Sequence, residues 1–201
     1  MTIDYRALGT ELSAMATEDL RVRGELAGTG ELFCGYHPRM REIHRRNARR
    51  LLAIIDTCGW PGKSRVGAEA ADAAWLILQH AIDNPSLQRR GLELLTIAVR
   101  SGDVERKQVA MLEDRIRINE GKPQWYGTQF DWDRSGHLSP LPIEDAANVD
   151  RRRAALGLCP IDHEIAQKRR AAAANGECAP EDWQARQEAQ QEWRRSTGWL
   201  E

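Results

Sequence analysis

The sequence between Gln79 and Gln129 decides the fold, and polar groups mark both of its ends. It opens with Gln79-His80-Ala81-Ile82-Asp83 and closes with Gly121-Lys122-Pro123-Gln124-Trp125-Tyr126-Gly127-Thr128-Gln129. The helical part between them is apolar but carries Asp114-Arg115. An element that only packs would have leucine where these titratable and amide side chains stand. We interpret them as the wall of a polar pocket that the remaining segments support.

Apolar periodicity predicts helices on both sides of this stretch. Apolar residues three and four apart indicate one helix over residues 4–27 and a second over residues 38–56. Alanine-rich residues 68–82 form a third, which Asn84-Pro85 ends. The same pattern predicts further helices over residues 86–100, 103–119, 144–156, 161–174 and 180–195.

The helical period disappears between Pro123 and Pro142. Residues 124–130 are strand-like and residues 133–137 form a turn, which together predict a short hairpin. Glycines and a proline in residues 59–67 predict a fixed turn without helix. We therefore expect an all-α bundle with one short β-hairpin or extended loop, a domain over residues 1–160 and a helical tail over residues 161–201.

Composition narrows the class of protein. The 201 residues are 41% hydrophobic and carry a net charge of −1, which excludes a globally basic nucleic-acid binder. Arginines over residues 39–50 are interpreted as a solvated face, with an anion or nucleic-acid patch as the alternative. No aromatic residues interleave with them to stack bases, which argues against nucleic acid as a partner.

The expected location is the cytoplasm. The first residues lack a basic region followed by an apolar run, and no segment approaches 18 apolar residues, so neither a signal peptide nor a membrane span is expected. The four cysteines contain no C-x-x-C pair and are interpreted as free thiols in a reducing compartment: Cys34, Cys58, Cys159 and Cys178.

His80 is the first candidate catalytic residue. It ends a helix, where the dipole favours the charged imidazolium, and Asp83 three residues later would favour it further. Such a group suits general acid or base catalysis near neutral pH. The alternative is a histidine that caps the helix or bonds the backbone.

The second candidate element is Asp114-Arg115. Neighbours on a helix point about 100° apart, so each needs a partner from elsewhere or solvent. The third element supplies amides, a phenol, a hydroxyl and a glycine that lets backbone approach a ligand, which suits recognition of a small polar molecule: Gln124, Tyr126, Gly127, Thr128 and Gln129.

Asp19 occupies a position on the apolar stripe of the first helix. Arg23 lies one turn later, so the two form either an exposed ion pair or an inward pair at a pocket wall. No nucleophile motif and no pair of histidines at metal-ligand spacing occurs, so we expect neither metal nor cofactor. A metal site of scattered His and Asp residues remains as the alternative.

Four segments resemble a bacterial family of unknown function: Gly59-Trp60-Pro61-Gly62, Gln79-His80, Asp114-Arg115 and Gly121-x-Pro123-Gln124-x-Tyr126-Gly127-Thr128-Gln129-Phe130. The resemblance covers about residues 10–160, and Tyr-Gly-Thr-Gln is its most specific part. It implies a shared pocket but no particular chemistry. Relatives tend to carry an Asp and an Arg where Asp19 and Arg23 stand, which favours the inward pair.

Two functional hypotheses follow. The first is a cofactor-independent enzyme that performs acid–base chemistry on a small polar or anionic metabolite. It assigns proton transfer to His80, an orienting role to Asp83 or Asp114, and recognition to the remaining candidates: Asp19, Arg23, Gln79, Arg115, Gln124, Tyr126, Thr128 and Gln129. The second is a ligand-sensing or protein-interaction module with the same pocket. Its partner surface would be the tryptophan-containing tail, which docks back or meets another copy. Both require His80, Arg115 and Tyr126 to converge.

Overall fold

The computed structural model describes residues 2–33 and 35–201, and the chain divides into two compact units, Met1–Val109 and Ala110–Glu201. The all-α prediction is confirmed, since helices dominate both units and one two-stranded hairpin is present. The predicted division into residues 1–160 and 161–201 stays a prediction. Within the described ranges, no helix combines the length and apolar character that crossing a membrane requires.

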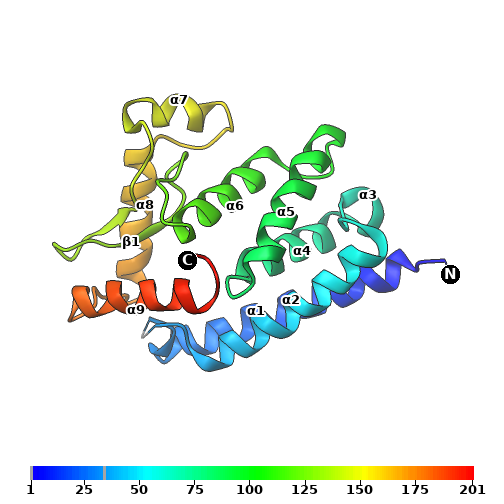
Figure 1. Ribbon diagram of the computed structural model, residues 1–201, viewed down its shortest axis with the longest axis horizontal. Coiled ribbons are helices and arrows are strands. Elements are labelled where there is room, and N and C mark those ends of the chain that lie inside the picture. The colour runs from blue at the N-terminus through cyan, green and yellow to red at the C-terminus, as the bar shows by residue number, and fades with distance from the viewer. Residues whose placement is uncertain (1, 34) are drawn as a thin grey trace. The chain divides into compact units, whose positions relative to one another are not determined.

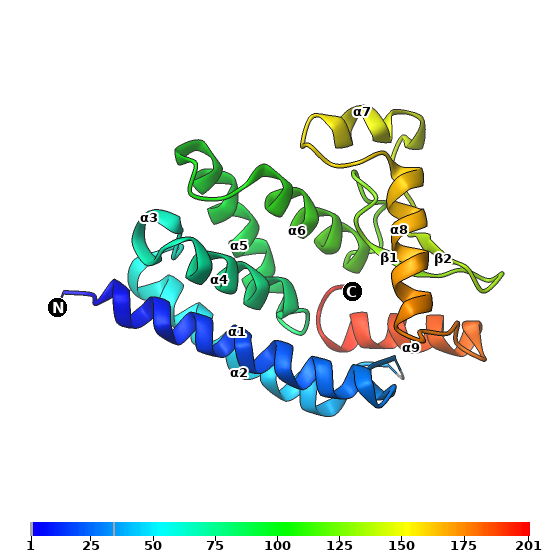
Figure 2. The same ribbon diagram turned by 180° about the vertical axis from the view of Figure 1, so that it is seen from behind.

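The first unit is built on three helices that pack on one another. These are α1 (Tyr5–Gly28), α2 (Pro38–Cys58) and α4 (Ala68–His80). Figures 1 and 2 show α1 and α2 side by side. The remaining elements are η1 (Glu31–Phe33), α3 (Lys63–Val66), α5 (Pro85–Ala98), η2 (Val99–Ser101) and the start of α6 (Arg106–Asn119).

Caps fix where these helices begin. The Asp4 carboxylate accepts hydrogen bonds from the backbone N–H groups of Arg6 and Ala7, both at 3.0 Å, and starts α1. Asn84 accepts from Leu87 N at 3.1 Å and starts α5, with Pro85 as its first residue. The core beneath them is aliphatic and closed to solvent: Leu12, Leu51, Leu78, Leu87 and Leu95.

The connection over residues 59–67 was predicted to contain no helix, and this is wrong for one turn, α3. Its cap comes from a residue far along the chain, because the Asp103 carboxylate accepts from Ser64 N at 2.6 Å and from Ser64 Oγ at 2.9 Å. A Cβ on Gly62 would lie 2.5 Å from Asp103 Oδ2, so glycine is needed there. Helix α6 begins at Arg106 rather than at residue 103, and Glu105 N donates to Gln108 Oε1 at its start, at 3.1 Å.

The second unit contains the end of α6, the hairpin β1 (Phe130–Trp132) and β2 (Leu138–Pro140), η3 (Ala146–Asn148), α7 (Val149–Ala154), α8 (Ile161–Ala174) and α9 (Trp183–Ser196). The strands are antiparallel, with Asp131 opposite Ser139. Asp133 closes the predicted turn by accepting from Ser135 N at 2.9 Å and His137 N at 3.0 Å. Helix α8 packs on β2 (Figure 2) and has the predicted bounds.

Two predicted helices of the second unit have different bounds. Asp145 has φ 46°, in the left-handed region, and this divides the predicted helix over residues 144–156 into η3 and α7. Asp182 caps α9 by accepting from Ala185 N at 2.9 Å, so that helix starts at Trp183 instead of Pro180.

The C-terminal tail docks on the hairpin of its own unit. Trp183 Nε1 donates to the backbone oxygen of Trp132 at 2.9 Å, and Arg186 and Gln190 contact the Asp131 carboxylate at 2.7 and 2.8 Å. Association of two copies through this tail stays a prediction. Cys58, Cys159 and Cys178 are free thiols, as predicted, while Cys34 lies outside the described residues.

Candidate functional site

Three side chains from three helices of the first unit meet at one point. Asp19 comes from α1, His44 from α2 and His80 from the last position of α4. His80 Nδ1 lies 3.0 and 2.9 Å from the two Asp19 oxygens, and His44 Nε2 lies 3.3 Å from Asp19 Oδ2. One ligand atom of each residue lies within 4.8 Å of the others. We call these three residues the Asp19 cluster.

The helical periodicity places the cluster in the core. Asp19 falls on the buried stripe of α1 between Leu12 and Leu26 and is 0% exposed. His44 is buried on α2 beside Ile43, and its ring centroid lies 4.8 Å from that of His80. A buried carboxylate is costly unless it is paired, and here the two imidazoles provide the pairing.

The surroundings of Asp19 keep its carboxylate ionised. Burial acts to raise the pKa of Asp19, but the close contacts of its oxygens with the imidazoles of His44 and His80 outweigh it and hold the pKa well below its usual range. A negative charge is therefore fixed between the two imidazole rings.

Tyr36 forms a second layer behind His44. Its hydroxyl oxygen lies 2.8 Å from His44 Nδ1, and the two rings stack at 5.7 Å between centroids. Burial and the nearby charge of Asp83 raise the pKa of the Tyr36 phenol, so the phenol is neutral. His44 is thereby oriented by one nitrogen, while the other, Nε2, faces Asp19 without making a hydrogen bond in the described part of the chain.

A cavity of about 180 Å³ lies beside the cluster, with His44 in its wall. The rest of its lining is Arg45, Ala48, Arg49, Ala81, Asp83 and Asn84. Arg45 Nε lies 2.7 Å from the Asp83 carboxylate, which also pairs with Arg41 at 3.1 Å. Arg49 has no carboxylate partner among the residues described, so positive charge exceeds negative charge in this wall. Such a lining suits a small anionic group.

The other arginines of α2 pair with carboxylates on neighbouring surfaces. Arg39 contacts Glu25 at 2.9 Å, and Arg46 contacts Glu18 at 2.6 Å. Arg50 likewise pairs with Glu11. These exposed pairs fit the interpretation of the arginine run as a solvated face, with Arg45 and Arg49 as members that line the cavity.

The inward placement predicted for Asp19 is confirmed, but its predicted partner is wrong. Arg23 is exposed, because the buried stripe of α1 continues through Val22 and leaves Arg23 outside it. His80 Nδ1 contacts the Asp19 carboxylate, and Asp83 pairs with Arg41 and Arg45. The expected influence of Asp83 on His80 stays a prediction.

Sequence reasoning missed one member of the cluster, His44, and two residues that support it, Tyr36 and Gln88. Gln88 is 0% exposed, and its Nε2 donates to the backbone oxygens of Leu78 and Gln79 at 2.9 and 3.1 Å, which secures the end of α4 just before His80. Gln79 itself is buried. One sequence pattern could have indicated His44 and Gln88: each follows an apolar residue of a buried helix stripe, in Ile43-His44 and Leu87-Gln88.

In the second unit, Asp114 organises the loop over residues 124–129. The carboxylate is 0% exposed and accepts from Trp125 N at 2.7 Å, Tyr126 N at 3.1 Å, Thr128 N at 3.1 Å and Thr128 Oγ1 at 2.9 Å. Burial raises the pKa of Asp114, while these hydrogen bonds oppose the rise. Because the loop wraps around this carboxylate, the hairpin starts at Phe130 and not at residue 124.

The predicted recognition residues of this loop contact one another. Gln124 Nε2 donates to the backbone oxygens of Gln129 and Leu141 at 2.9 and 2.8 Å, and Gln124 Oε1 accepts from Gln129 N at 2.8 Å. Gln129 Nε2 donates to Thr128 Oγ1 at 3.0 Å. Gly127 was interpreted as room for a ligand, but a Cβ there would meet Ile161 Cδ1 at 2.7 Å, so side-chain packing explains this glycine.

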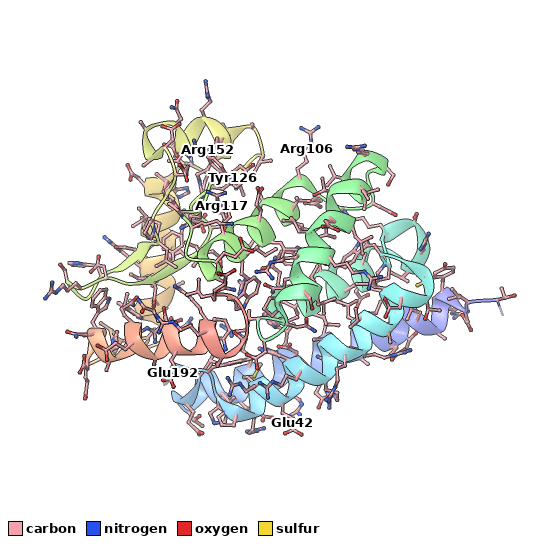
Figure 3. The ribbon with its side chains drawn as sticks, viewed as in Figure 1. Glu42, Arg106, Arg117, Tyr126, Arg152 and Glu192 are labelled. Carbon is pink, nitrogen blue, oxygen red and sulfur yellow. The ribbon has the colours of Figure 1, made fainter. Side chains whose placement is uncertain are left out.

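Arginines hold the loop from outside. Arg153 is 1% exposed and donates to the backbone oxygens of Tyr126 and Cys159, both at 2.6 Å. The guanidinium carbons of Arg117 and Arg152 lie 4.4 and 5.7 Å from the Trp125 ring centroid. Figure 3 labels Arg117, Tyr126 and Arg152, which come from α6, the loop and α7.

The predicted site residues thus fall into two groups. The first unit holds Asp19, Arg23, Gln79, His80 and Asp83, and the second holds Asp114, Arg115, Gln124, Tyr126, Thr128 and Gln129. The structure brings Asp19 together with His80, and Asp114 together with the loop residues. Convergence of His80, Arg115 and Tyr126 stays a prediction.

Comparison with curated proteins gave no match, and comparison with solved structures gave none either. A family model, in contrast, matches residues 6–174. This match extends beyond both ends of the resemblance over residues 10–160 that the sequence motifs indicated. The chain therefore belongs to the family of unknown function DUF6624.

Proposed function

We propose that this protein is an enzyme that performs acid–base chemistry on a small polar or anionic molecule, with the Asp19 cluster as its reacting centre. The observation that carries the proposal is the ionised Asp19 carboxylate, 0% exposed, held by imidazoles from two other helices. Burying these polar and charged groups costs more free energy of desolvation than burying leucine side chains in the same place. Buried clusters of titratable groups are concentrated at functional sites.

The cavity beside His44 supports the choice of substrate class. Its lining joins Arg45 and Arg49 to the side chain of Asn84, which provides charge and hydrogen bonds for a carboxylate or phosphate group. At about 180 Å³ the cavity is smaller than most ligand pockets, so it suits only a very small metabolite or the anionic end of a larger one. His80 would transfer the proton, and Asp19 would orient its imidazole, the role that the sequence analysis assigned to Asp83 or Asp114.

The test is a search for turnover with a matched pair of histidine variants. Wild-type protein, His80→Gln and His37→Asn are incubated with pools of small carboxylates and phosphate esters, and consumption is followed by mass spectrometry. His37 lies outside the cluster and caps α2 through Nδ1, and asparagine can also cap a helix. We expect a compound that wild type and His37→Asn consume equally, and whose turnover falls about 100-fold or more in His80→Gln.

Two results would count against the enzyme. Equal turnover by wild type and His80→Gln would remove the cluster from the chemistry. Binding of a pool member, with the affinity lost in Arg49→Gln and with no consumption by wild type, would instead favour the ligand-sensing module. Arg46→Gln is the control for that binding experiment, because Arg46 lies on the same helix but pairs with Glu18.

A further inference from the structure

We infer that Asp19, His44 and His80 together bind one divalent transition-metal ion of the zinc type. The ion would deepen the proposed function, because its bound water would be the group that exchanges a proton, and only this use of the ion rests on that function. Binding of the ion itself rests on the geometry of the three side chains. It departs from the expectation of a metal-free site, which rested on the absence of short ligand motifs.

The spacing of the donor atoms suits such an ion. Zinc binds imidazole nitrogen and carboxylate oxygen at about 2.0–2.2 Å in a tetrahedron, which separates neighbouring donors by about 3.4 Å. Here Asp19 Oδ2 lies 2.9 Å from His80 Nδ1 and 3.3 Å from His44 Nε2. All three donor atoms lie within 4.8 Å of one another. Side-chain shifts of a few tenths of an ångström would admit the ion.

His44 gives the second, independent observation. Its side chain is 8% exposed, and Nε2 faces the Asp19 carboxylate without a hydrogen bond. If Nδ1 carries the proton and donates to the Tyr36 oxygen at 2.8 Å, Nε2 presents a lone pair to a carboxylate oxygen. Two acceptors facing each other in a buried place repel, and a cation between them removes the repulsion.

The same contact supplies the outer shell that metal-bound histidines usually have. A ligating histidine donates its other ring N–H to a partner that fixes the tautomer and the ring orientation. Tyr36 is placed to be that partner for His44, and its phenol is neutral because burial and the charge of Asp83 raise its pKa. The ring of His44 is therefore already oriented toward the common point of the cluster.

The charge and the number of ligands select the class of ion. Metal ligation requires both imidazoles to be neutral, so the three side chains would carry a net charge of −1, which a divalent ion more than compensates. Nitrogen-rich donor sets suit zinc, cobalt, nickel and iron, whereas magnesium and calcium prefer oxygen. Three protein ligands also leave a position for water, as in catalytic zinc sites.

The test uses the metal-depleted full-length protein titrated with Co²⁺ and followed by visible absorption. We expect one ion per chain, a spectrum of nitrogen and oxygen ligation, and displacement by Zn²⁺. His44→Gln and His80→Gln should each weaken binding by about 100-fold or more, and Tyr36→Phe by about 10-fold. His37→Asn is the matched control and should bind as wild type does.

X-ray absorption of the zinc-loaded wild type needs no variant and covers the case in which a variant fails to fold. Two imidazoles and only nitrogen or oxygen donors are expected, and sulfur in the first shell would overturn the assignment. Absence of Co²⁺ binding by wild type, or binding unchanged in both histidine variants, would also overturn it. If binding fails but turnover still requires His80, the proposed function stands without the ion. If the ion binds while His80→Gln keeps its turnover, the proposed function fails and the metal site stands.

Discussion

Replacing Asp114 should loosen the loop over residues 124–129 in proportion to the hydrogen bonds that are lost. The carboxylate accepts from three backbone N–H groups and one hydroxyl: those of Trp125, Tyr126, Thr128 N and Thr128 Oγ1. In Asp114→Asn, the amide oxygen can still accept from Trp125 N and Tyr126 N. The new NH₂ group would face Thr128 N, whose donor then stays unpaired in a buried place.

The magnitudes follow from this count. One buried donor without a partner costs about 1–3 kcal/mol, which is the expected loss of unfolding free energy for Asp114→Asn. Asp114→Ala removes all four acceptor contacts, and at about 1 kcal/mol for each the loss is about 4 kcal/mol. Asp162→Asn, an exposed acid on α8, is the control and should change stability by about 0.5 kcal/mol or less.

The assay combines urea denaturation with hydrogen exchange followed by mass spectrometry. Exchange reports the loop locally, since the amides of Trp125, Tyr126 and Thr128 are the groups that Asp114 holds. Both variants should speed exchange there, Asp114→Ala more than Asp114→Asn, while amides of the first unit keep their rates. Unchanged exchange in Asp114→Ala, with stability equal to that of the control, would refute the reasoning.

Three other changes test separate contacts. Gly62→Ala would place Cβ 2.5 Å from Asp103 Oδ2 and displace the cap of α3. The free energy of unfolding measured by thermal denaturation should fall by about 1–2 kcal/mol. An unchanged melting temperature would contradict the assigned cap. Arg153→Met leaves the backbone oxygens that Arg153 bonds without a partner, so the free energy of unfolding measured in urea should fall by about 3–5 kcal/mol. A loss no larger than that for replacing an exposed arginine would be inconsistent with the burial of Arg153. Burial, and then the charge of Asp114, raise the pKa of Glu113, so the folded state disfavours its ionised form. The free energy of unfolding should therefore fall as the pH rises from the ordinary Glu pKa through the raised one. Glu113→Gln should therefore be more stable than wild type at pH 7, and the difference should disappear below the ordinary Glu pKa; a constant difference across this range would count against the shift.

Much of the fold could be predicted because its helices obey local rules. The apolar stripes of α1 and α2, the Asn84-Pro85 start of α5 and the bounds of α8 all follow from neighbours in the sequence. Errors arose where a distant residue decides a local structure. Asp103 caps α3 from 39 positions away, and Asp114 draws residues 124–129 out of the strand.

The candidate site shows the same limit. The burial of Asp19 could be inferred from the stripe of α1, because helical period alone determines which face turns inward. Its partners could not, since His44 and His80 lie 25 and 61 positions later (44 − 19 and 80 − 19) and come close only when three helices pack. Arg23 was the nearest opposite charge in the sequence, yet the nearest charges in space come from other helices.

The alanine face of α4 has a consequence for where the imidazole of His80 can stand. Ala70, Ala71, Ala73 and Ala74 are all buried, and on α1 a Cβ at Gly9 would come within 3.4 Å of the Ala70 methyl group. Because the two helix backbones lie this close, no space remains for a larger side chain. A methyl group added on this face of α4 would displace the whole helix rather than one side chain. The His80 imidazole at the end of α4 would move with the helix. The alanines two and three turns away therefore determine the position of this imidazole as much as the residues that contact it do.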